Sequence, residues 1–163
     1  MRVIALADTH APRRWKTCPP AVAPWLRQAD AILHAGDVCV AAVLDELAGY
    51  APVHAVVGNN DAPDVAAWGA RPTIEIELAG LTIAMIHDAG AAAGRLRRMR
   101  TAFPHADIVV YGHSHIPLDA GDGKFRIFNP GSPTDRRRQP RGTIGVLEID
   151  DGRLVEARLV EVD

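Results

Sequence analysis

Five short polar segments of this chain contain residue types that bind divalent metal ions, and each follows an apolar run. They are Asp8-Thr9-His10, Gly36-Asp37, Gly58-Asn59-Asn60-Asp61, His87-Asp88 and Gly112-His113-Ser114-His115. Mixed ligation by carboxylate, imidazole and amide groups suits Mn, Fe, Zn or Ni. The segments therefore indicate metal chemistry, and a chance gathering of polar loop residues is the alternative.

The apolar runs before these segments have the length and the turn-bounded pattern of buried strands. They are Val3–Ala7, Ala31–His34, Val53–Val57, Leu81–His87 and Ile108–Tyr111. In open α/β sheets, ligands bind outside the carboxyl ends of the strands. We therefore expect seven side chains to meet at that edge: Asp8, His10, Asp37, Asn59, His87, His113 and His115.

The segments between the strands change character along the chain. Pro20–Gln28 and Cys39–Leu47 have helical length and pattern, which predicts a β-α-β-α-β unit with parallel strands, and Ala91–Thr101 is a further predicted helix. The rest reads as hairpins, because paired apolar stretches flank glycine-containing turns. The hairpins join Thr73–Leu78 to Leu81–His87, Ile116–Leu118 to Phe125–Phe128, and Thr143–Ile149 to Leu154–Val162. Two sheets packed face to face, with helices outside, would bury all of these elements.

Size and composition fit one domain, residues 1–163, with a substantial core. The net charge of −2 gives no basic field, so nucleic acid is not an expected partner. The two cysteines, Cys18 and Cys39, match neither a disulfide framework nor a zinc ribbon and are expected to be reduced. No run has the length of a signal peptide's apolar region or of a membrane span, so we expect a cytoplasmic protein.

Seven ligands are more than one cation needs, whereas a shared carboxylate that bridges two cations would divide them sensibly. Two metals roughly 3.5–4 Å apart are the usual device for in-line displacement at phosphorus, in which a hydroxide held between them attacks. The ligand set therefore predicts hydrolysis of phosphate esters.

The order D-x-H, G-D, G-N-x-D, H, G-H-x-H resembles that of the calcineurin-like metallophosphoesterases. The small size and the segment Asn129-Pro130-Gly131-Ser132 resemble their compact branch, which holds small phosphodiesterases and a related retromer subunit. The resemblance covers Asp8 to Ser132. It implies an α/β fold, a four-layered α-β-β-α sandwich with two mixed sheets.

The resemblance also implies the ligand assignment. Asp8, His10 and His115 would bind the first metal, Asn59, His87 and His113 the second, and Asp37 would bridge the two. Asp37, Asn59 and His113 would stand at the reacting centre. Mn is the expected metal of both sites, with Fe, Zn or Ni as alternatives.

The chain departs from the family pattern at Asn60, where larger relatives have a histidine that protonates the leaving group. Asparagine has no titratable proton, so Asn60 is expected to bind substrate only, with Asp61 orienting it or its loop. Asp88 replaces a usual glycine and would crowd the second metal, adjust its water shell or face solvent. Thr9 replaces a commoner serine without expected consequence.

Several further residues have two interpretations each. Arg137 would clamp a phosphate or organise its loop, or else belong to a solvated turn. The arginine-rich stretch Arg95–Arg100 is most simply a solvated helix face. Trp15 and Trp25 would pack a loop rather than line a substrate rim. The remaining histidines, His34, His54 and His105, are expected to be structural or surface residues, without a contact behind the site.

The sequence thus predicts a phosphodiesterase that acts on a small-molecule phosphate ester. Both a monomer and a homo-oligomer are compatible with the sequence. The alternatives are a non-catalytic scaffold on the same fold and a nuclease. Retention of all seven ligand residues favours the enzyme over the scaffold. The acidic net charge disfavours a duplex substrate.

Overall fold

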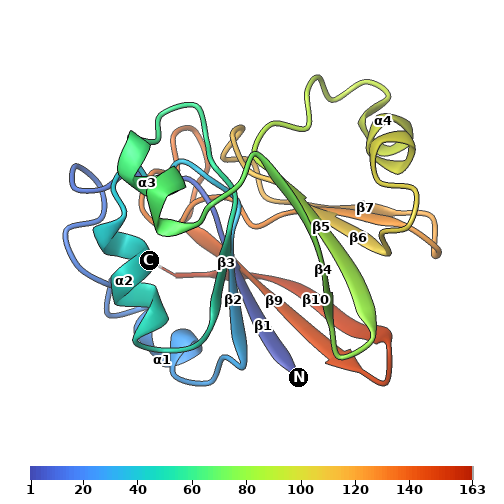
Figure 1. Ribbon diagram of the computed structural model, residues 1–163, viewed down its shortest axis with the longest axis horizontal. Coiled ribbons are helices and arrows are strands. Elements are labelled where there is room, and N and C mark those ends of the chain that lie inside the picture. Colours follow the sequence, from blue (N-terminus) through green and yellow to red (C-terminus); the bar gives the residue numbers. More distant parts are fainter. Residues whose placement is uncertain (163) are drawn as a thin grey trace.

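Two five-stranded sheets pack face to face in this protein, as a computed structural model that describes residues 1–162 shows (Figure 1). Helices flank both sheets, so the layers follow the predicted α-β-β-α order. The last residue of the predicted domain, Asp163, lies outside the described residues. Within those residues, no helix has the length and apolar character needed to cross a membrane.

The first sheet holds the strands of the β-α-β-α-β unit and the C-terminal hairpin. Its strands run in the order β10-β9-β1-β2-β3. Strands β1, β2 and β3 are parallel to one another, and β9 is antiparallel to both β1 and β10. The bounds are β1 Arg2–Leu6, β2 Ala31–His34, β3 Val53–Ala55, β9 Thr143–Asp150 and β10 Arg153–Glu161.

The second sheet is also mixed, with strand order β4-β5-β6-β8-β7. Its three central strands, β5, β6 and β8, are parallel, and each edge strand runs antiparallel to its neighbour. The bounds are β4 Thr73–Leu78, β5 Leu81–Ile86, β6 Ile108–Val110, β7 Leu118–Gly121 and β8 Arg126–Asn129. Parallel central strands place their carboxyl ends together at one edge.

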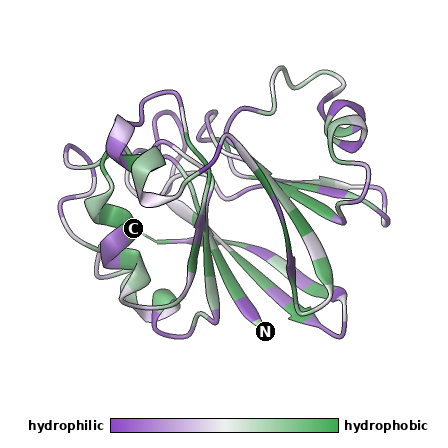
Figure 2. Cartoon of the chain, in the orientation of Figure 1, coloured by the Kyte–Doolittle hydropathy of each residue, from purple (hydrophilic) through white to green (hydrophobic). Residues whose placement is uncertain are grey.

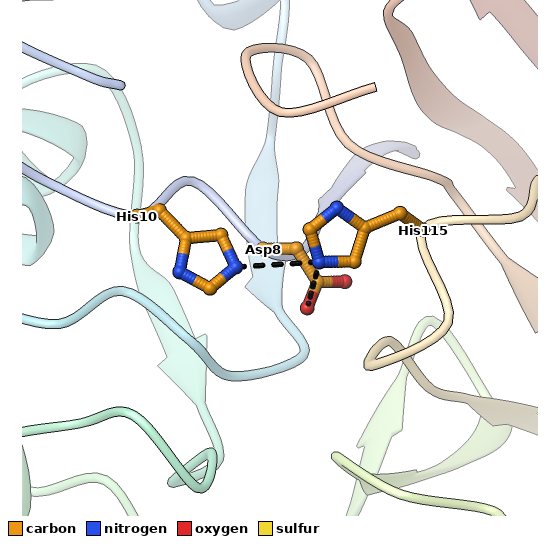
Figure 3. Close-up of side chains that lie close together, drawn as sticks. All are labelled: Asp8, His10 and His115. Atoms are coloured by element: carbon orange, nitrogen blue, oxygen red, sulfur yellow. Dashed lines mark hydrogen bonds and ion pairs between the residues drawn. The ribbon is translucent and has the colours of Figure 1, made fainter. Parts of the chain in front are cut away.

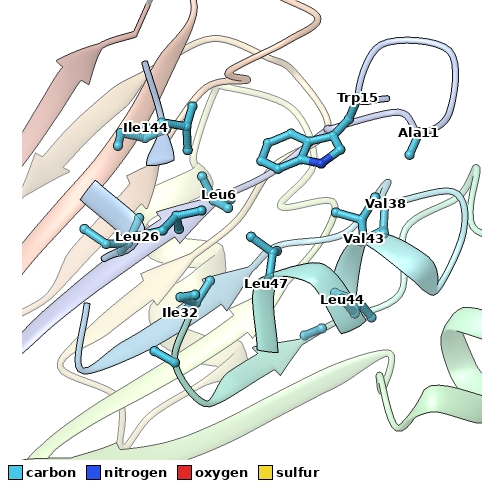
Figure 4. Packing of buried hydrophobic residues seen from close by; sticks show 14 of the residues in the cluster. Leu6, Ala11, Trp15, Leu26, Ile32, Val38, Val43, Leu44, Leu47 and Ile144 are labelled. Atoms are coloured by element: carbon cyan, nitrogen blue, oxygen red, sulfur yellow. The ribbon is translucent and has the colours of Figure 1, made fainter. Parts of the chain in front are cut away.

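Alternation of side chains along the strands divides the core into layers. On β1, Val3 and Ala5 face the second sheet, whereas Ile4 and Leu6 face the helices. Figure 2 shows hydrophobic residues along the strands of both sheets. Figure 4 shows the helix-side layer, where Leu26, Leu44 and Leu47 pack against the first sheet. Fully buried strands on both faces explain why the apolar runs are nearly continuous.

The helices are shorter than the patterns predicted. Helix α1 is a single turn, Ala23–Leu26, because the prolines around it remove backbone donors. Helix α2 spans Ala42–Ala48 and α4 spans Arg95–Ala102. Helix α3, Pro63–Trp68, was not predicted, because only Val65 of its residues is buried and no apolar stripe marks it.

The second predicted hairpin also differs at its start. Its first strand begins at Leu118 rather than at Ile116, which lies in the preceding loop. Pro117 stands between them and lacks the N–H that a ladder hydrogen bond needs. Ile116 is consequently left about half exposed, with 52% of its surface accessible.

Candidate metal centre

All five polar segments lie at the carboxyl edge of the two sheets. Asp8-Thr9-His10 follows β1 and Asp37 follows β2, while Asn59 follows β3. The second sheet supplies His87 after β5 and His113-Ser114-His115 after β6. Polar segments that are far apart in sequence and follow strands of both sheets therefore lie at one place.

The first cluster comprises Asp8, His10 and His115, which point toward one another (Figure 3). His115 Nε2 lies 3.3 Å from His10 Nε2 and 3.3 Å from Asp8 Oδ1. The three residues can each offer one ligand atom within 4.8 Å of the others. Such spacing leaves room for one cation between the three side chains.

Asp37 lies between this cluster and a second one. Its Oδ2 lies 3.7 Å from His10 Nε2, and its Oδ1 lies 3.4 Å from His87 Nε2. Burial alone would raise the pKa of the carboxyl, but hydrogen bonds from His87 and Asn60 hold the pKa well below its usual range. Asp37 is therefore a carboxylate with one oxygen toward each cluster.

The second cluster brings together His87, Asn59 and His113. Asn59 Oδ1 lies 3.1 Å from His87 Nε2 and 2.9 Å from His113 Nδ1. His87 also belongs to a group with Asp8 and Asp37 whose potential ligand atoms lie within 4.8 Å of one another. All seven residues that the sequence analysis singled out thus converge, in two clusters joined by Asp37.

Backbone carbonyls orient two of the histidines. His87 Nδ1 donates to the carbonyl of Ala35 at 2.7 Å, and His115 Nδ1 donates to the carbonyl of Asp135. With Nδ1 protonated, the Nε2 lone pair faces the cluster, which is how metal-binding histidines are usually arranged. Sequence analysis missed both partners, because a backbone carbonyl carries no residue-type signal.

Nearby acidic charge also acts on these two rings. Burial lowers the pKa of His87, but hydrogen bonds to Asp37 and Ala35 together with the carboxylate charges raise it above its ordinary value. Burial also lowers the pKa of His115, but the hydrogen bond to Asp8 and the charge of Asp8 outweigh this effect, so the pKa of His115 is raised as well. The pKa of His10 is lowered, because burial outweighs Asp37 and Asp8 there. A metal must displace protons to bind His87 and His115 fully.

The backbone is strained at the site. Five of the seven residues have left-handed φ angles between 50° and 67°, a region that side chains other than glycine rarely adopt. They are Asp8, His10, Asp37, His113 and His115. The segment after β8 helps to hold this geometry, since Ser132 Oγ donates to the carbonyl of Asp8 at 2.8 Å and Thr134 Oγ1 to that of Thr9 at 2.9 Å. Clustered strain of this kind is typical of functional sites.

Two glycines permit the close approach of these loops. A Cβ at Gly58 would lie 2.3 Å from Asp37 Oδ1, and one at Gly112 would lie 2.8 Å from Asp8 Oδ2. Both distances are too short for carbon and oxygen atoms. The glycine of each G-N and G-H motif is therefore required by packing against a carboxylate of the site.

Asn60 and Asp61 have separate tasks in the structure. Asn60 Nδ2 donates to Asp37 Oδ2 at 2.7 Å, and the Asn60 backbone N–H donates to Asp37 Oδ1 at 2.8 Å. Asp61 accepts from the backbone N–H groups of Gly58 and Cys39, each at 2.6 Å. Of the two expected roles of Asp61, the structure supports organisation of the loop.

Three other expectations can be compared with the structure. Asp88 is exposed and accepts from the backbone N–H of Gly90, so of its three interpretations the solvent-facing one holds. Arg137 is exposed, and its Nη1 donates to the carbonyl of His113 at 3.4 Å, which places it beside the site. Trp15 is buried and donates to Glu46 at 2.7 Å, so it packs a loop as expected.

His34 is a buried structural residue, which agrees with the expectation for it. Its ring is fully buried, and its Nε2 lies 3.1 Å from Thr9 Oγ1 in the first site segment. Pairing of β1 with β2 in register brings the two together, which composition cannot reveal. His34 therefore contacts the first site segment through Thr9, which is not one of the seven potential ligands. Burial lowers its pKa to about 3, so the ring is neutral at physiological pH.

The donor set fits two divalent cations. Asp8 Oδ2 is buried and, among the described residues, has no hydrogen-bond partner, which is costly for a carboxylate oxygen unless a cation pairs with it. Three more imidazole nitrogens and both oxygens of Asp37 face the same small volume. The chain thus contains a candidate dinuclear metal centre, whose metal the residue types leave open.

Comparison with known proteins defines the class. Residues 1–152 match the model of the calcineurin-like phosphoesterase superfamily domain. A protein of Methanothermobacter thermautotrophicus described as a probable metallophosphoesterase is 32% identical over 163 residues, with 98% of this chain and 92% of that protein covered. The chain therefore belongs to the calcineurin-like metallophosphoesterase superfamily.

Solved structures share the compact fold. Vps29 of Entamoeba histolytica, crystallised in complex with Zn²⁺, superimposes with a TM-score of 0.79 at 24% identity, covering 100% of both chains. A structure described as a novel archaeal phosphodiesterase gives a TM-score of 0.76 at 21% identity, covering 99% of each chain. The α/β fold with two mixed sheets is thus the fold of the Vps29-like members.

Proposed function

We propose that this chain is a phosphodiesterase whose reaction centre holds two divalent metal ions, with Mn as the first candidate. The observation that carries the proposal is the position of Asp37. Its two carboxylate oxygens face separate clusters, 3.7 Å from His10 Nε2 and 3.4 Å from His87 Nε2. A carboxylate shared in this way is what a pair of cations at bridging distance requires.

In this proposal the two clusters divide the ligands. Asp8, His10 and His115 hold one ion, Asn59, His87 and His113 hold the other, and Asp37 serves both. When bound, such ions supply Lewis acidity and a water of lowered pKa that can act as the nucleophile at neutral pH. His113 and Asn59 stand beside the reacting phosphate.

The remaining residues of the site would bind the substrate. Arg137 lies against the carbonyl of His113, from where its guanidinium can reach a phosphate oxygen. Asn60 offers an amide donor but no titratable proton, so the leaving group would depart without protonation by this residue. That limitation favours esters with acidic leaving groups. The archaeal structural neighbour described as a phosphodiesterase supports the choice of a diester.

Hydrolysis of bis(p-nitrophenyl) phosphate by the purified, Mn-loaded protein tests this function. We expect Asp37→Asn to reduce kcat by at least about a hundredfold, because the bridging charge is lost. Asparagine tolerates the left-handed backbone at this position, so the substitution isolates the charge. Asp151→Asn, in the exposed β9–β10 turn and also left-handed, is the matched control and should keep the wild-type rate. An unaffected rate in Asp37→Asn would overturn the mechanism.

A non-catalytic scaffold on the same fold is the alternative function, because Asn60 has no titratable proton to give a leaving group. Because a Vps29 has itself been crystallised with Zn²⁺, metal binding alone does not separate the two functions. Turnover does. A protein that binds two metal ions but hydrolyses no diester with Mn, Fe, Zn or Ni would be a scaffold.

A further inference from the structure

A pocket of about 430 Å³ lies on the outer face of the second sheet, between α4 and β7. Its lining is mainly apolar and includes Leu96 from α4, Leu118 and Ala120 from β7, Ile127 from β8, and Ile116 and Ser114 from the loop before β7. Pockets of this size and character bind small molecules in many proteins. None of the roles assigned above uses it.

Both loops that carry the second sheet's histidines continue into this pocket. The loop after His87 arches from the end of β5 to α4 (Figure 1), and its residues Ala92 and Gly94 line the pocket. On the other side, Ser114 stands between His113 and His115. The pocket and the metal centre therefore share the loop after β6, in which Ser114 lines the pocket and its neighbours His113 and His115 belong to the metal centre.

Arg95 connects the two loops at the pocket. Its Nη2 donates to the carbonyl of Gly90 at 2.6 Å, and its Nη1 donates to the hydroxyl of Tyr111 at 2.9 Å. This arginine was expected to lie on a solvated helix face, but its guanidinium fixes the wall of the pocket. One wall of the pocket is thus fixed by specific contacts, in which the Arg95 guanidinium is already hydrogen-bonded to protein oxygens.

Ile116 gives the pocket an unusual exposed apolar wall. It is 52% exposed directly after His115, although few large apolar side chains in the described residues are exposed. Exposed apolar surface beside a polar site costs free energy that a ligand can recover by covering it. Since the charged phosphate belongs with the metal ions in the proposed function, an apolar ester group is the part of a diester that suits the apolar lining around Ile116.

We infer that this pocket holds an uncharged ester group of aromatic size on the phosphate diester whose phosphate binds at the metal centre. The inference rests on the proposed function and names its substrate class. Diesters with an aromatic group would bind through both the metal centre and the pocket, whereas diesters with two small alkyl groups would bind through the metal centre alone.

Binding of two phosphonates to the Mn-loaded protein tests the inference without turnover. By isothermal titration calorimetry, phenylphosphonate should bind about tenfold more tightly than methylphosphonate, because its ring buries additional apolar surface. Ile116→Ser should reduce that preference to about threefold or less and leave the affinity for methylphosphonate unchanged. Val155→Ser is the matched control, since Val155 is also apolar and is still more exposed, at 67%, but lies on β10 of the other sheet.

A second variant fills the pocket instead of opening it. Ala120→Phe should abolish the preference for phenylphosphonate by occupying the space of the ring, and circular dichroism establishes that the variant is folded. Equal affinity of the wild-type protein for both phosphonates, with diester hydrolysis intact, would overturn the inference and leave the proposed function standing. Absence of both phosphonate binding and diester hydrolysis would overturn the proposed function and the inference with it.

Discussion

At the scale of single residues, the site combines a complete set of metal-type side chains with no proton donor at Asn60. The amide of Asn60 is bonded to Asp37 and fixes the shared carboxylate rather than a leaving group. His87 and His115 are each oriented by a second contact, to the backbone carbonyls of Ala35 and Asp135. The candidate centre can therefore position metal ions, and under the proposed function the leaving group would depart without protonation by Asn60.

Asn60→His should give this chain the proton donor for the leaving group that Asn60 does not provide. Because a histidine at this position can protonate a departing alkoxide, we expect the rate with a dialkyl phosphate to rise relative to that with bis(p-nitrophenyl) phosphate by at least about tenfold. Steady-state kinetics with both substrates measures the ratio. Asn60→Gln, which adds no titratable proton, is the control, and an equal ratio in the two variants would contradict the role assigned to Asn60.

His10 is oriented by a thiol, unlike His87 and His115. Cys39 Sγ lies 3.5 Å from His10 Nδ1, and Cys39 itself has a left-handed backbone that Asp61 holds through the N–H. Burial and nearby carboxylates raise the pKa of the Cys39 thiol to about 11, so it stays uncharged at neutral pH. The sulfur can then accept a hydrogen bond from the Nδ1–H of His10 and leave Nε2 free for a metal.

Cys39→Ala should weaken Mn binding at the first cluster about 10- to 100-fold, as loss of outer partners does at other metal sites. Cys39→Ser should recover part of the affinity, because its hydroxyl also accepts a hydrogen bond. Cys18→Ala, at the other half-buried cysteine, should bind Mn like the wild-type protein. Calorimetric titration with Mn measures all three, and identical affinities for Cys39→Ala and Cys18→Ala would refute this role.

At the scale of elements, apolar runs predicted the central strands because both faces of those strands are buried. The same runs placed the polar segments at strand ends, which is why the seven site residues could be named from sequence. Helix α3 could not be predicted, since its one buried residue, Val65, makes no periodic pattern. The contact of His34 with Thr9 and the carbonyl partners of the histidines depend on strand register, which residue types do not encode.

The two sheets contact each other at β9, where Gly145 faces Phe128 of β8. A Cβ at Gly145 would lie 2.3 Å from a carbon of the Phe128 ring. Gly145→Ala should therefore destabilise the protein by about 1–3 kcal/mol through overpacking. Urea unfolding measures the change. In the double variant with Phe128→Leu, part of the penalty should disappear, and strictly additive losses would show that this contact is not its cause.

At the scale of the whole molecule, the candidate centre connects the two sheets. Asp8, His10, Asp37 and Asn59 come from the first sheet, whereas His87, His113 and His115 come from the second. Metal ions bound by both sets would cross-link the sandwich at its carboxyl edge. Binding and folding are then coupled, because the unfolded chain has no such site.

Mn at about 100 times its dissociation constant should stabilise the protein by about 2.7 kcal/mol over a chelator-treated sample, or roughly 5–10 °C in melting temperature. His115→Ala should lose most of this shift, whereas His105→Ala, at an exposed histidine outside the centre, should keep it. Differential scanning calorimetry with and without EDTA measures both. A full shift in His115→Ala would show that the metal does not bind at this edge.

The shift should also grow with pH. In the metal-free protein the pKa values of His87 and His115 are raised above 6.5. The stabilisation that their protonated rings contribute to the fold is therefore fully present below that pH, and it is lost as the pH rises through the folded-state pKa values. Metal binding needs the neutral rings, so protons compete with it most strongly below the same values. Metal-free stability should therefore fall as the pH rises above about 6.5, while the Mn-induced shift rises. A Mn-induced shift that is equal at pH 6 and pH 8 would mean that these two histidines do not bind the ions.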